Sequence, residues 1–432
     1  MGVTEAFSPV AIEPAARLLL ACTLRSPASD ARGIEALAGA VADWDAFLVS
    51  ADQCLAIPFV HRHLPAFDRF LPAAARLRLR QLHTAGTANN LQLAALLTRL
   101  HDQWFARRAI RYAAVKGAAL AQRFYGDVAA RTSRDLDLLV DPAACPATIR
   151  YLVDAGFRPC RGFELPADRA KWERYIAAMC DLNREISLRS PAGDLVDVHT
   201  SLDLTGGDFP TRHLLSRVET VPIFGKPIPA LSTADLFVYL CYHHSRHNWT
   251  RLHWVADIGQ VTAAPGFDAA AVRAVARRSG MEGLVEECQA MLGLLNAATR
   301  GEAPAGRGLA ATMARQCLAH LAPGAESPLL AYHHRIDDSG FRWRHWFSLT
   351  AEEWRHRRGL VRKLRTVLRS STPSWESYKA LPLPKGLRWL YMPLRTGTHL
   401  VRHTPLRRLT RRKGSAAAQP SSDATIAPDT RG

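Results

Sequence analysis

The chain has 432 residues, 48% of them hydrophobic, which is enough to bury a substantial core and excludes a wholly disordered protein. Its eight cysteines are scattered without a Cys-x-x-Cys pair, a pattern that argues against zinc fingers and disulfide scaffolds and favours reduced thiols. The net charge of +17 is uneven: residues 331–413 hold 20 Lys and Arg against 5 Asp and Glu, whereas the remaining residues hold 36 against 34.

A secretory signal has a basic region ahead of its apolar stretch. The apolar stretch near the amino terminus of this chain has none. No uninterrupted apolar run approaches the roughly 18 residues that a bilayer span needs. We therefore expect a cytoplasmic protein, with attachment to the inner face of the membrane as an alternative.

Residues 1–108 are expected to be helical, because apolar side chains recur there with helical spacing, as at Leu93, Leu96, Leu97 and Leu100. Residues 109–120 read AIRYAAVKGAAL and change character. The simplest interpretation is a short strand that ends at a glycine turn, followed by a helix that runs toward Tyr125.

Residues 131–140 read RTSRDLDLLV and contain two aspartates separated by one leucine. Side chains two apart in a strand project to the same face, so Asp135 and Asp137 should lie side by side while Leu136 and Leu138 enter a core. Two neighbouring anions need a cation, and hard oxygen ligands suit Mg²⁺. A charged edge strand is the competing interpretation.

After Asp141 and Pro142 we expect a helix over residues 143–155 that ends at Gly156. Residues 183–190 and 194–202 alternate polar and apolar positions on either side of a Pro-Ala-Gly turn, which predicts a β-hairpin. In its second arm, Asp197 and His199 share the face opposite the valines. A third carboxylate is therefore predicted on a second strand.

Residues 231–330 are expected to be helical again, with Ser232 or Thr233 as the N-cap and Asp235 in the first turn. A histidine-rich window in this region contains His243, His244, His247 and His253. His243 and His247 have the spacing of a zinc pair, but the sequence offers no identifiable third ligand. The favoured interpretation is a helix packed beside the active site.

Residues 331–413 form a basic segment that contains five tryptophans, and residues 414–432 have the composition of a disordered tail. The basic segment suits an anionic membrane surface, with nucleic acid as a less favoured partner, but the favoured interpretation is a solvated basic face of a helical domain. The expected division of the chain is 1–108, 109–230, 231–330, 331–413 and 414–432.

Three carboxylates on adjoining strands are the minimum for a two-metal nucleotidyl transfer, with ions about 3.5–4 Å apart. Asp135 and Asp137 are expected to bind both ions, and Asp197 to bind one of them and accept the proton of the attacking hydroxyl. Lys116, Gly117 and Arg131 are expected to contact the triphosphate of an NTP. Ser133 is expected to bind the nucleotide with them. His199 is expected to orient a carboxylate or the acceptor.

The stretch AAVKGAALAQRFYGDVAARTSRDLDLLVDP, together with LVDVHTSL at 195–202, resembles the uncharacterised nucleotidyltransferase family of the polymerase beta superfamily. It is also similar to antibiotic nucleotidyltransferases, which have a Gly-Gly-Trp-Ala turn and an Arg-x-x-x-Asp-x-Asp strand in the same order. Gly117, Asp135, Asp137 and Asp197 fall on motif positions. The usual Gly-Ser or Gly-Gly turn of the superfamily reads Lys-Gly-Ala here, a form that looks typical of this family.

The resemblance implies an α+β fold, with a mixed β-sheet nucleotidyltransferase core flanked by amino-terminal and carboxy-terminal helical regions. It also implies Mg²⁺-dependent transfer of a nucleoside monophosphate from NTP to an unidentified small-molecule, sugar or protein hydroxyl. Asp257 resembles a recurrent family position. The alternative function is a catalytically silent nucleotide-binding or scaffolding module, which could be attached to a membrane through residues 331–413.

Overall fold

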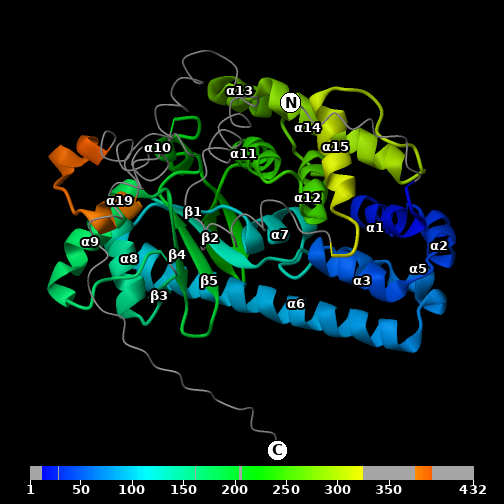
Figure 1. Ribbon diagram of the computed structural model, residues 1–432, viewed down its shortest axis with the longest axis horizontal. Helices are drawn as coiled ribbons and strands as arrows, with labels where there is room; N and C mark the ends of the chain where they lie inside the picture. The colour runs from blue at the N-terminus through cyan, green and yellow to red at the C-terminus, as the bar shows by residue number, and fades with distance from the viewer. Residues whose placement is uncertain (1–11, 28, 161, 204–206, 325–374, 392–432) are drawn as a thin grey trace, which may run out of the picture. The chain divides into compact units, whose positions relative to one another are not determined.

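The computed structural model describes residues 12–27, 29–160, 162–203, 207–324 and 375–391 (Figure 1). The chain divides into two compact units, Met1–Ser370 and Ser371–Gly432. Most of the basic segment predicted at 331–413, and all of the tail predicted at 414–432, lie outside the described residues. Those expectations therefore stay predictions.

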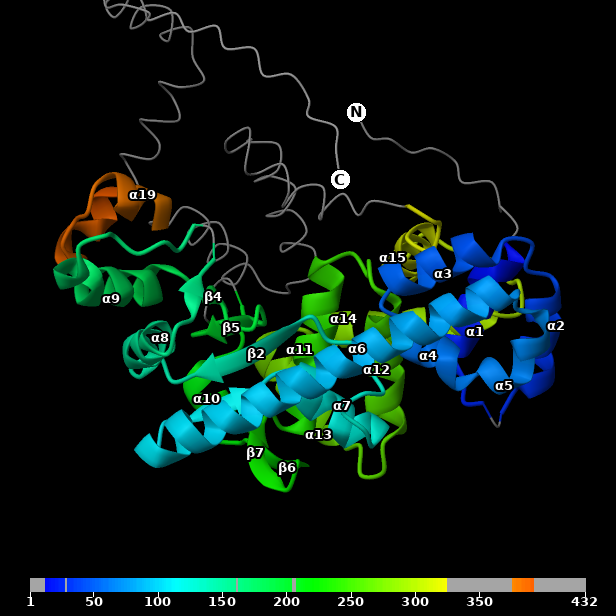
Figure 2. The ribbon, with the colours of Figure 1, turned by 90° about the horizontal axis from the view of Figure 1, so that it is seen from below.

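The amino-terminal part of the first unit is helical, as the sequence predicts. Its described helices are α1 Pro14–Leu24, α2 Ala31–Gly39, α3 Trp44–Gln53, α4 Ile57–Arg62, α5 Leu64–Phe67 and α6 Ala73–Leu100, with short η1 Asp68–Phe70, η2 His101–Phe105 and η3 Ala106–Arg108. Asp43 caps α3, because its carboxylate accepts a hydrogen bond from the Ala46 amide at 2.9 Å. Figure 2 shows α6 extending from the other amino-terminal helices across to the β-sheet.

A seven-stranded mixed sheet forms the centre of the first unit, with the strand order β3-β4-β5-β2-β1-β7-β6. Its strands are β1 Tyr112–Ala114, β2 Asp135–Val140, β3 Arg158–Pro159, β4 Glu185–Arg189, β5 Leu195–His199, β6 Glu219–Ile223 and β7 Lys226–Ala230. β2 runs parallel to β5 and antiparallel to β1. The predicted α+β class and mixed sheet are confirmed.

The elements predicted around the candidate site fold as expected. The short strand β1 leads through Lys116 into helix α7, Gly117–Tyr125. β2 buries Leu136 and Leu138. β4 and β5 form the predicted antiparallel hairpin, whose turn contains Gly193 at a φ of 96°. Helix α8, Cys145–Asp154, follows β2 and ends just before Gly156, whose φ is 89°.

Helix α6 holds the chain on either side of these strands. Asn90 donates from its amide nitrogen to the Arg131 carbonyl at 2.9 Å, and its side-chain oxygen accepts from the Ser133 amide at 2.9 Å. Asn89 donates to the Ser133 carbonyl at 2.8 Å. Gln92 donates to the Asp194 carboxylate at 2.5 Å, in the β4–β5 turn. One long helix therefore fixes both the entry to β2 and the entry to β5.

The β6–β7 hairpin was not predicted from the sequence. Its two strands contain Pro222, Pro227 and Pro229, and proline normally argues against a strand because it has no N–H to donate. The turn is made by Phe224 and Gly225, both with positive φ. β7 reaches the rest of the sheet through one paired position, Ala114 with Ala230.

The helices that follow the last strand contribute many side chains to the main hydrophobic core. They are α11 Thr233–Arg246, α12 Leu252–Ala263, α13 Ala269–Ser279, α14 Glu282–Ala298 and α15 Leu309–Ala319. Between strands in the chain lie the short η4 Arg169–Lys171, α9 Trp172–Leu182 and α10 Thr211–Leu215. Ser232 is the N-cap of α11, as predicted, and its side chain accepts from the Asp235 amide. Trp249, just after this helix, is fully buried.

The described part of the second unit is α19 Trp375–Ala380 and η5 Lys385–Leu390. Trp375 stacks on Tyr378 with ring centroids 5.4 Å apart, and Tyr391 donates its hydroxyl to the Leu381 carbonyl. Trp389 is 62% exposed. Over the described residues, no helix has both the length and the apolar character required for a membrane span.

Candidate active site

Three aspartates meet where β2 and β5 lie side by side. In the parallel register Asp137 lies opposite Asp197, and Asp135 lies one pleat away on the same face of β2. One carboxylate oxygen from each aspartate lies within 4.8 Å of the others. Asp137 and Asp197 are buried and Asp135 is half-buried. The strand arrangement predicted from the alternation of apolar and acidic residues is therefore present.

Burial and mutual repulsion shape the titration of this acid triad. Burial and the charge of Asp137 raise the pKa of Asp135 to about 6. Burial and the charge of Glu185 raise the pKa of Asp197 to about 7. Burial also disfavours the charged form of Asp137, but Lys116 and His199 outweigh it and lower the Asp137 pKa below its usual range. The triad thus holds more negative charge than its surroundings neutralise.

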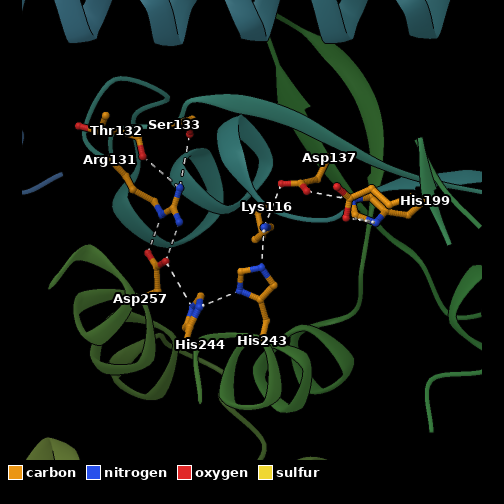
Figure 3. Close-up of polar contacts among 10 residues, drawn as sticks. Lys116, Arg131, Thr132, Ser133, Asp137, His199, His243, His244 and Asp257 are labelled. Carbon is orange, nitrogen blue, oxygen red and sulfur yellow. Dashed lines mark hydrogen bonds and ion pairs between the residues drawn. The ribbon is translucent and has the colours of Figure 1, made fainter. Parts of the chain in front are cut away.

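Lys116 places its ammonium group against this triad. Its Nζ lies 3.2 Å from Asp137 Oδ2 and 3.3 Å from His243 Nε2, and its side chain is only 12% exposed (Figure 3). Burial alone would lower the pKa of Lys116, but the charge of Asp137 reverses the effect and raises the pKa. A buried, permanently charged lysine beside a metal-type acid cluster is suited to contact a phosphate.

Gly117 opens α7 directly after Lys116. Its φ of 61° lies in the left-handed region that side chains disfavour, whereas a Cβ added there would meet only ordinary contacts at 3.7 Å, with the Asp135 carbonyl and Ser133 Oγ. The conformation of the turn, rather than lack of space, therefore requires glycine. The first amides of the nine-residue helix α7 begin here.

His199 contacts the triad from β5. Its Nε2 lies 2.9 Å from Asp137 Oδ1, and its Nδ1 lies 3.7 Å from Glu185 Oε2. Burial would lower the pKa of His199, but the hydrogen bond to Asp137 and the charge of Glu185 raise it. His199 is therefore placed to orient a carboxylate of the triad, and that role stays a prediction.

Arg131 is placed in a buried ion pair. Its Nε lies 2.7 Å from Asp257 Oδ1 and its Nη2 lies 2.8 Å from Asp257 Oδ2, a bidentate contact. Its Nη1 faces Ser133 Oγ at 3.4 Å, and Ser133 is itself buried. Nε, Nη1 and Nη2 of this guanidinium thus all contact other side chains of the protein. Contact of Arg131 and Ser133 with a nucleotide stays a prediction.

Two contacts near the triad have no direct indication in the sequence. Glu185 faces His199 across the β4–β5 hairpin, and pairing the two arms of that hairpin residue by residue would have located it. His243 reaches Lys116 from α11, 127 residues away, and no local pattern encodes that contact. Among the described residues, the aspartates are the one group of three or more His, Cys, Asp or Glu with metal-ligand spacing, so the zinc alternative at His243 and His247 finds no third ligand there.

Comparison with known proteins agrees with this geometry. A family model described as "uncharacterised nucleotidyltransferase" matches residues 40–295, which include the sheet, the acid triad, α6, α11 and α12. A search of curated proteins gives no match to the chain.

Proposed function

The chain belongs to the uncharacterised nucleotidyltransferase family, and from this premise we propose that it is a Mg²⁺-dependent enzyme. It transfers a nucleoside monophosphate from an NTP to a hydroxyl acceptor. The observation that carries the proposal is the convergence of Asp135, Asp137 and Asp197 within 4.8 Å. The acceptor is a hydroxyl group of a small molecule, a sugar or a protein.

The ligand set favours a hard divalent cation. All three donors are carboxylate oxygens, the ligands that Mg²⁺ takes together with water and substrate phosphates. Asp197 Oδ1 is buried without a hydrogen-bond partner in the described part of the chain, which leaves its lone pairs to a ligand. Burial, and then the charge of neighbouring carboxylates, raises the pKa values of Asp135 and Asp197, and two Mg²⁺ ions would oppose both effects.

In the proposed reaction the acceptor hydroxyl gives up its proton and its oxygen bonds to the α-phosphorus of the NTP. The bond from the α-phosphorus to the bridging oxygen breaks, and pyrophosphate leaves. Asp135 and Asp137 would hold both Mg²⁺ ions and Asp197 one of them, and the ions would supply charge neutralisation on the triphosphate and a lower pKa for the attacking hydroxyl. Asp197 accepts the proton of the acceptor.

Residues at the start of α7 hold the nucleotide in this proposal. Lys116 already lies beside Asp137, so its ammonium group can contact a triphosphate held over the triad. The backbone amide of Gly117 is at the positive end of α7, where phosphate oxygens are favoured. Arg131 and Ser133, on the loop before β2, complete the proposed nucleotide-binding set, and Ser133 Oγ lies 3.7 Å from where a Cβ on Gly117 would be.

The test separates binding from turnover. Purified protein is melted with each of the four common NTPs, with and without Mg²⁺, and is then incubated with each α-labelled NTP and a cell extract. A ligand at a hundredfold excess over its Kd should add about 2.7 kcal/mol to the free energy of unfolding. Labelled product that depends on Mg²⁺ supports the enzyme. A melting shift with no labelled product would instead support the silent nucleotide-binding module.

A further inference from the structure

The hydrogen bond between Lys116 and His243 fixes the chemical state of the histidine. A lysine ammonium group has three donors and no acceptor, so His243 Nε2, 3.3 Å away, must carry a lone pair. Burial and the charge of Lys116 hold the pKa of His243 well below its usual range, so the imidazole is neutral. Its one proton is therefore on Nδ1.

His244 continues the same chain of donors and acceptors. His243 Nδ1 lies 3.1 Å from His244 Nδ1, so the first ring donates and the second accepts. Burial also lowers the pKa of His244 well below its usual range, and its neutral ring must then carry its proton on Nε2. That proton faces Asp257 Oδ2, with the two heavy atoms 4.0 Å apart. Figure 3 shows this path from Lys116 to Asp257.

Asp257 anchors the far end of the chain. It is fully buried on α12, and it accepts two hydrogen bonds from Arg131 and one, at 2.9 Å, from the Tyr125 hydroxyl. Its charge favours the Nε2–H form of His244, because a lone pair facing a carboxylate would be repelled. One assignment of protons satisfies the hydrogen bonds from Lys116 to His244. At the far end His244 Nε2 has no hydrogen-bond partner in the described part of the chain, and Asp257 acts on it through its charge.

We propose that His243 is a positioning residue for Lys116: its neutral Nε2 holds the ammonium group beside the acid triad without neutralising the charge that the triphosphate requires. His244 and Asp257 maintain the required tautomer. This inference rests on the proposed function, since Lys116 is taken to contact the NTP. An acid at position 243 would hold the amine equally well but would cancel its charge and repel the phosphates. A neutral acceptor is the suitable group.

The first test reads the tautomers without any nucleotide. Protein labelled with ¹⁵N-histidine is examined by long-range proton–nitrogen NMR at neutral pH, and each ring is assigned by loss of its signal in His243→Gln or His244→Gln. We expect His243 as the Nδ1–H form and His244 as the Nε2–H form. The Nε2–H form, or a protonated ring, at His243 would overturn the proposal.

The second test measures the Kd of each Mg·NTP that binds the wild-type protein, by calorimetry. Glutamine at 243 offers a neutral acceptor, so His243→Gln should stay within about threefold of the wild-type Kd. Loss of a hydrogen bond to a charged group should weaken His243→Phe roughly tenfold, and His243→Glu should be weaker still. If His243 had a purely structural role, the increase in Kd of each variant would instead follow its loss of thermal stability.

His63→Phe is the matched control. His63 is a buried histidine whose Nδ1 bonds the Phe59 carbonyl, remote from the triad on the loop after α4. Its replacement removes an imidazole of equal size and should leave the Kd unchanged. Equal Kd values for His243→Gln and His243→Glu, or an unaltered Kd in His243→Phe, would overturn the proposal. If no wild-type Mg·NTP binding is found, the proposed function fails, and the tautomers still decide whether this hydrogen-bond chain exists.

Discussion

Asp257 and Asp137 are both buried carboxylates, and the protein neutralises them in different ways. Asp257 meets a bidentate guanidinium and a tyrosine hydroxyl, so its charge and its lone pairs are matched within the fold. Asp137 meets one ammonium group and one imidazole, but two further aspartates lie within reach of the same ligand. The first arrangement is closed. The second leaves carboxylates unpaired by cations of the fold, which is the difference expected between a structural ion pair and the proposed metal site.

The sharpest way to break this comparison is Asp137→Asn. The proposed function predicts a loss of turnover of at least roughly 10³-fold, about 4 kcal/mol of transition-state stabilisation, because both ions lose a shared ligand. Labelled product formed per folded molecule is the measurement, and circular dichroism checks that the fold persists. Turnover near the wild-type rate would remove Asp137 from the proposed metal site.

Asp257→Asn is the corresponding change in the ion pair with Arg131. It leaves the Arg131 guanidinium buried without its counter-ion, so we expect a loss of about 3–5 kcal/mol in the free energy of unfolding, with or without Mg²⁺. Urea titration measures it. Asp235→Asn is the matched control: Asp235 is also buried and paired with an arginine, but Arg217 is 41% exposed and water can solvate it, so the loss should be smaller. Equal losses would contradict the expected role of burial.

The pH dependence of stability should separate the two sites when Mg²⁺ is chelated. Asp197 has a folded-state pKa of about 7 against an ordinary value of 3.8, so the folded chain binds more protons than the unfolded chain between these values. Stability contributed by this group is then lost as pH rises through that window. Between pH 5 and pH 8 the free energy of unfolding should fall less in Asp197→Asn than in the wild type, by on the order of 1–2 kcal/mol. Parallel curves for the variant and the wild type would contradict the assignment.

The smallest effect is expected from Tyr125→Phe. The change removes one hydrogen bond to Asp257 and leaves the Arg131 pair intact, so about 1 kcal/mol of stability should be lost. Tyr151→Phe, which retains the stacking of its ring on Trp104, is the control and should cost less. A loss near that of Asp257→Asn would show that the hydroxyl, rather than the guanidinium, is the main partner.

The sequence predicted those parts of the site that local patterns encode. A period of two places acids and leucines on opposite faces of β2, and the hairpin pattern predicts the strand that carries Asp197. The parallel pairing that sets Asp197 opposite Asp137 joins strands far apart in the sequence, and no local pattern specifies it. The β6–β7 hairpin was missed because its three prolines contradict strand patterns. The Arg131–Asp257 pair joins residues 126 apart, and its bidentate geometry depends on how α12 packs, which no short pattern specifies.

The asparagines on α6 limit how this protein can be dissected. A fragment that began at residue 109 would keep all seven strands but would lack Asn89 and Asn90, which bond the backbone of Arg131 and Ser133 just ahead of the acidic strand. Three backbone groups of that loop, the Arg131 carbonyl and the Ser133 amide and carbonyl, would then need other partners. Deletion series and minimal expression fragments should therefore retain the long helix, whose residues also lie inside the segment matched by the family.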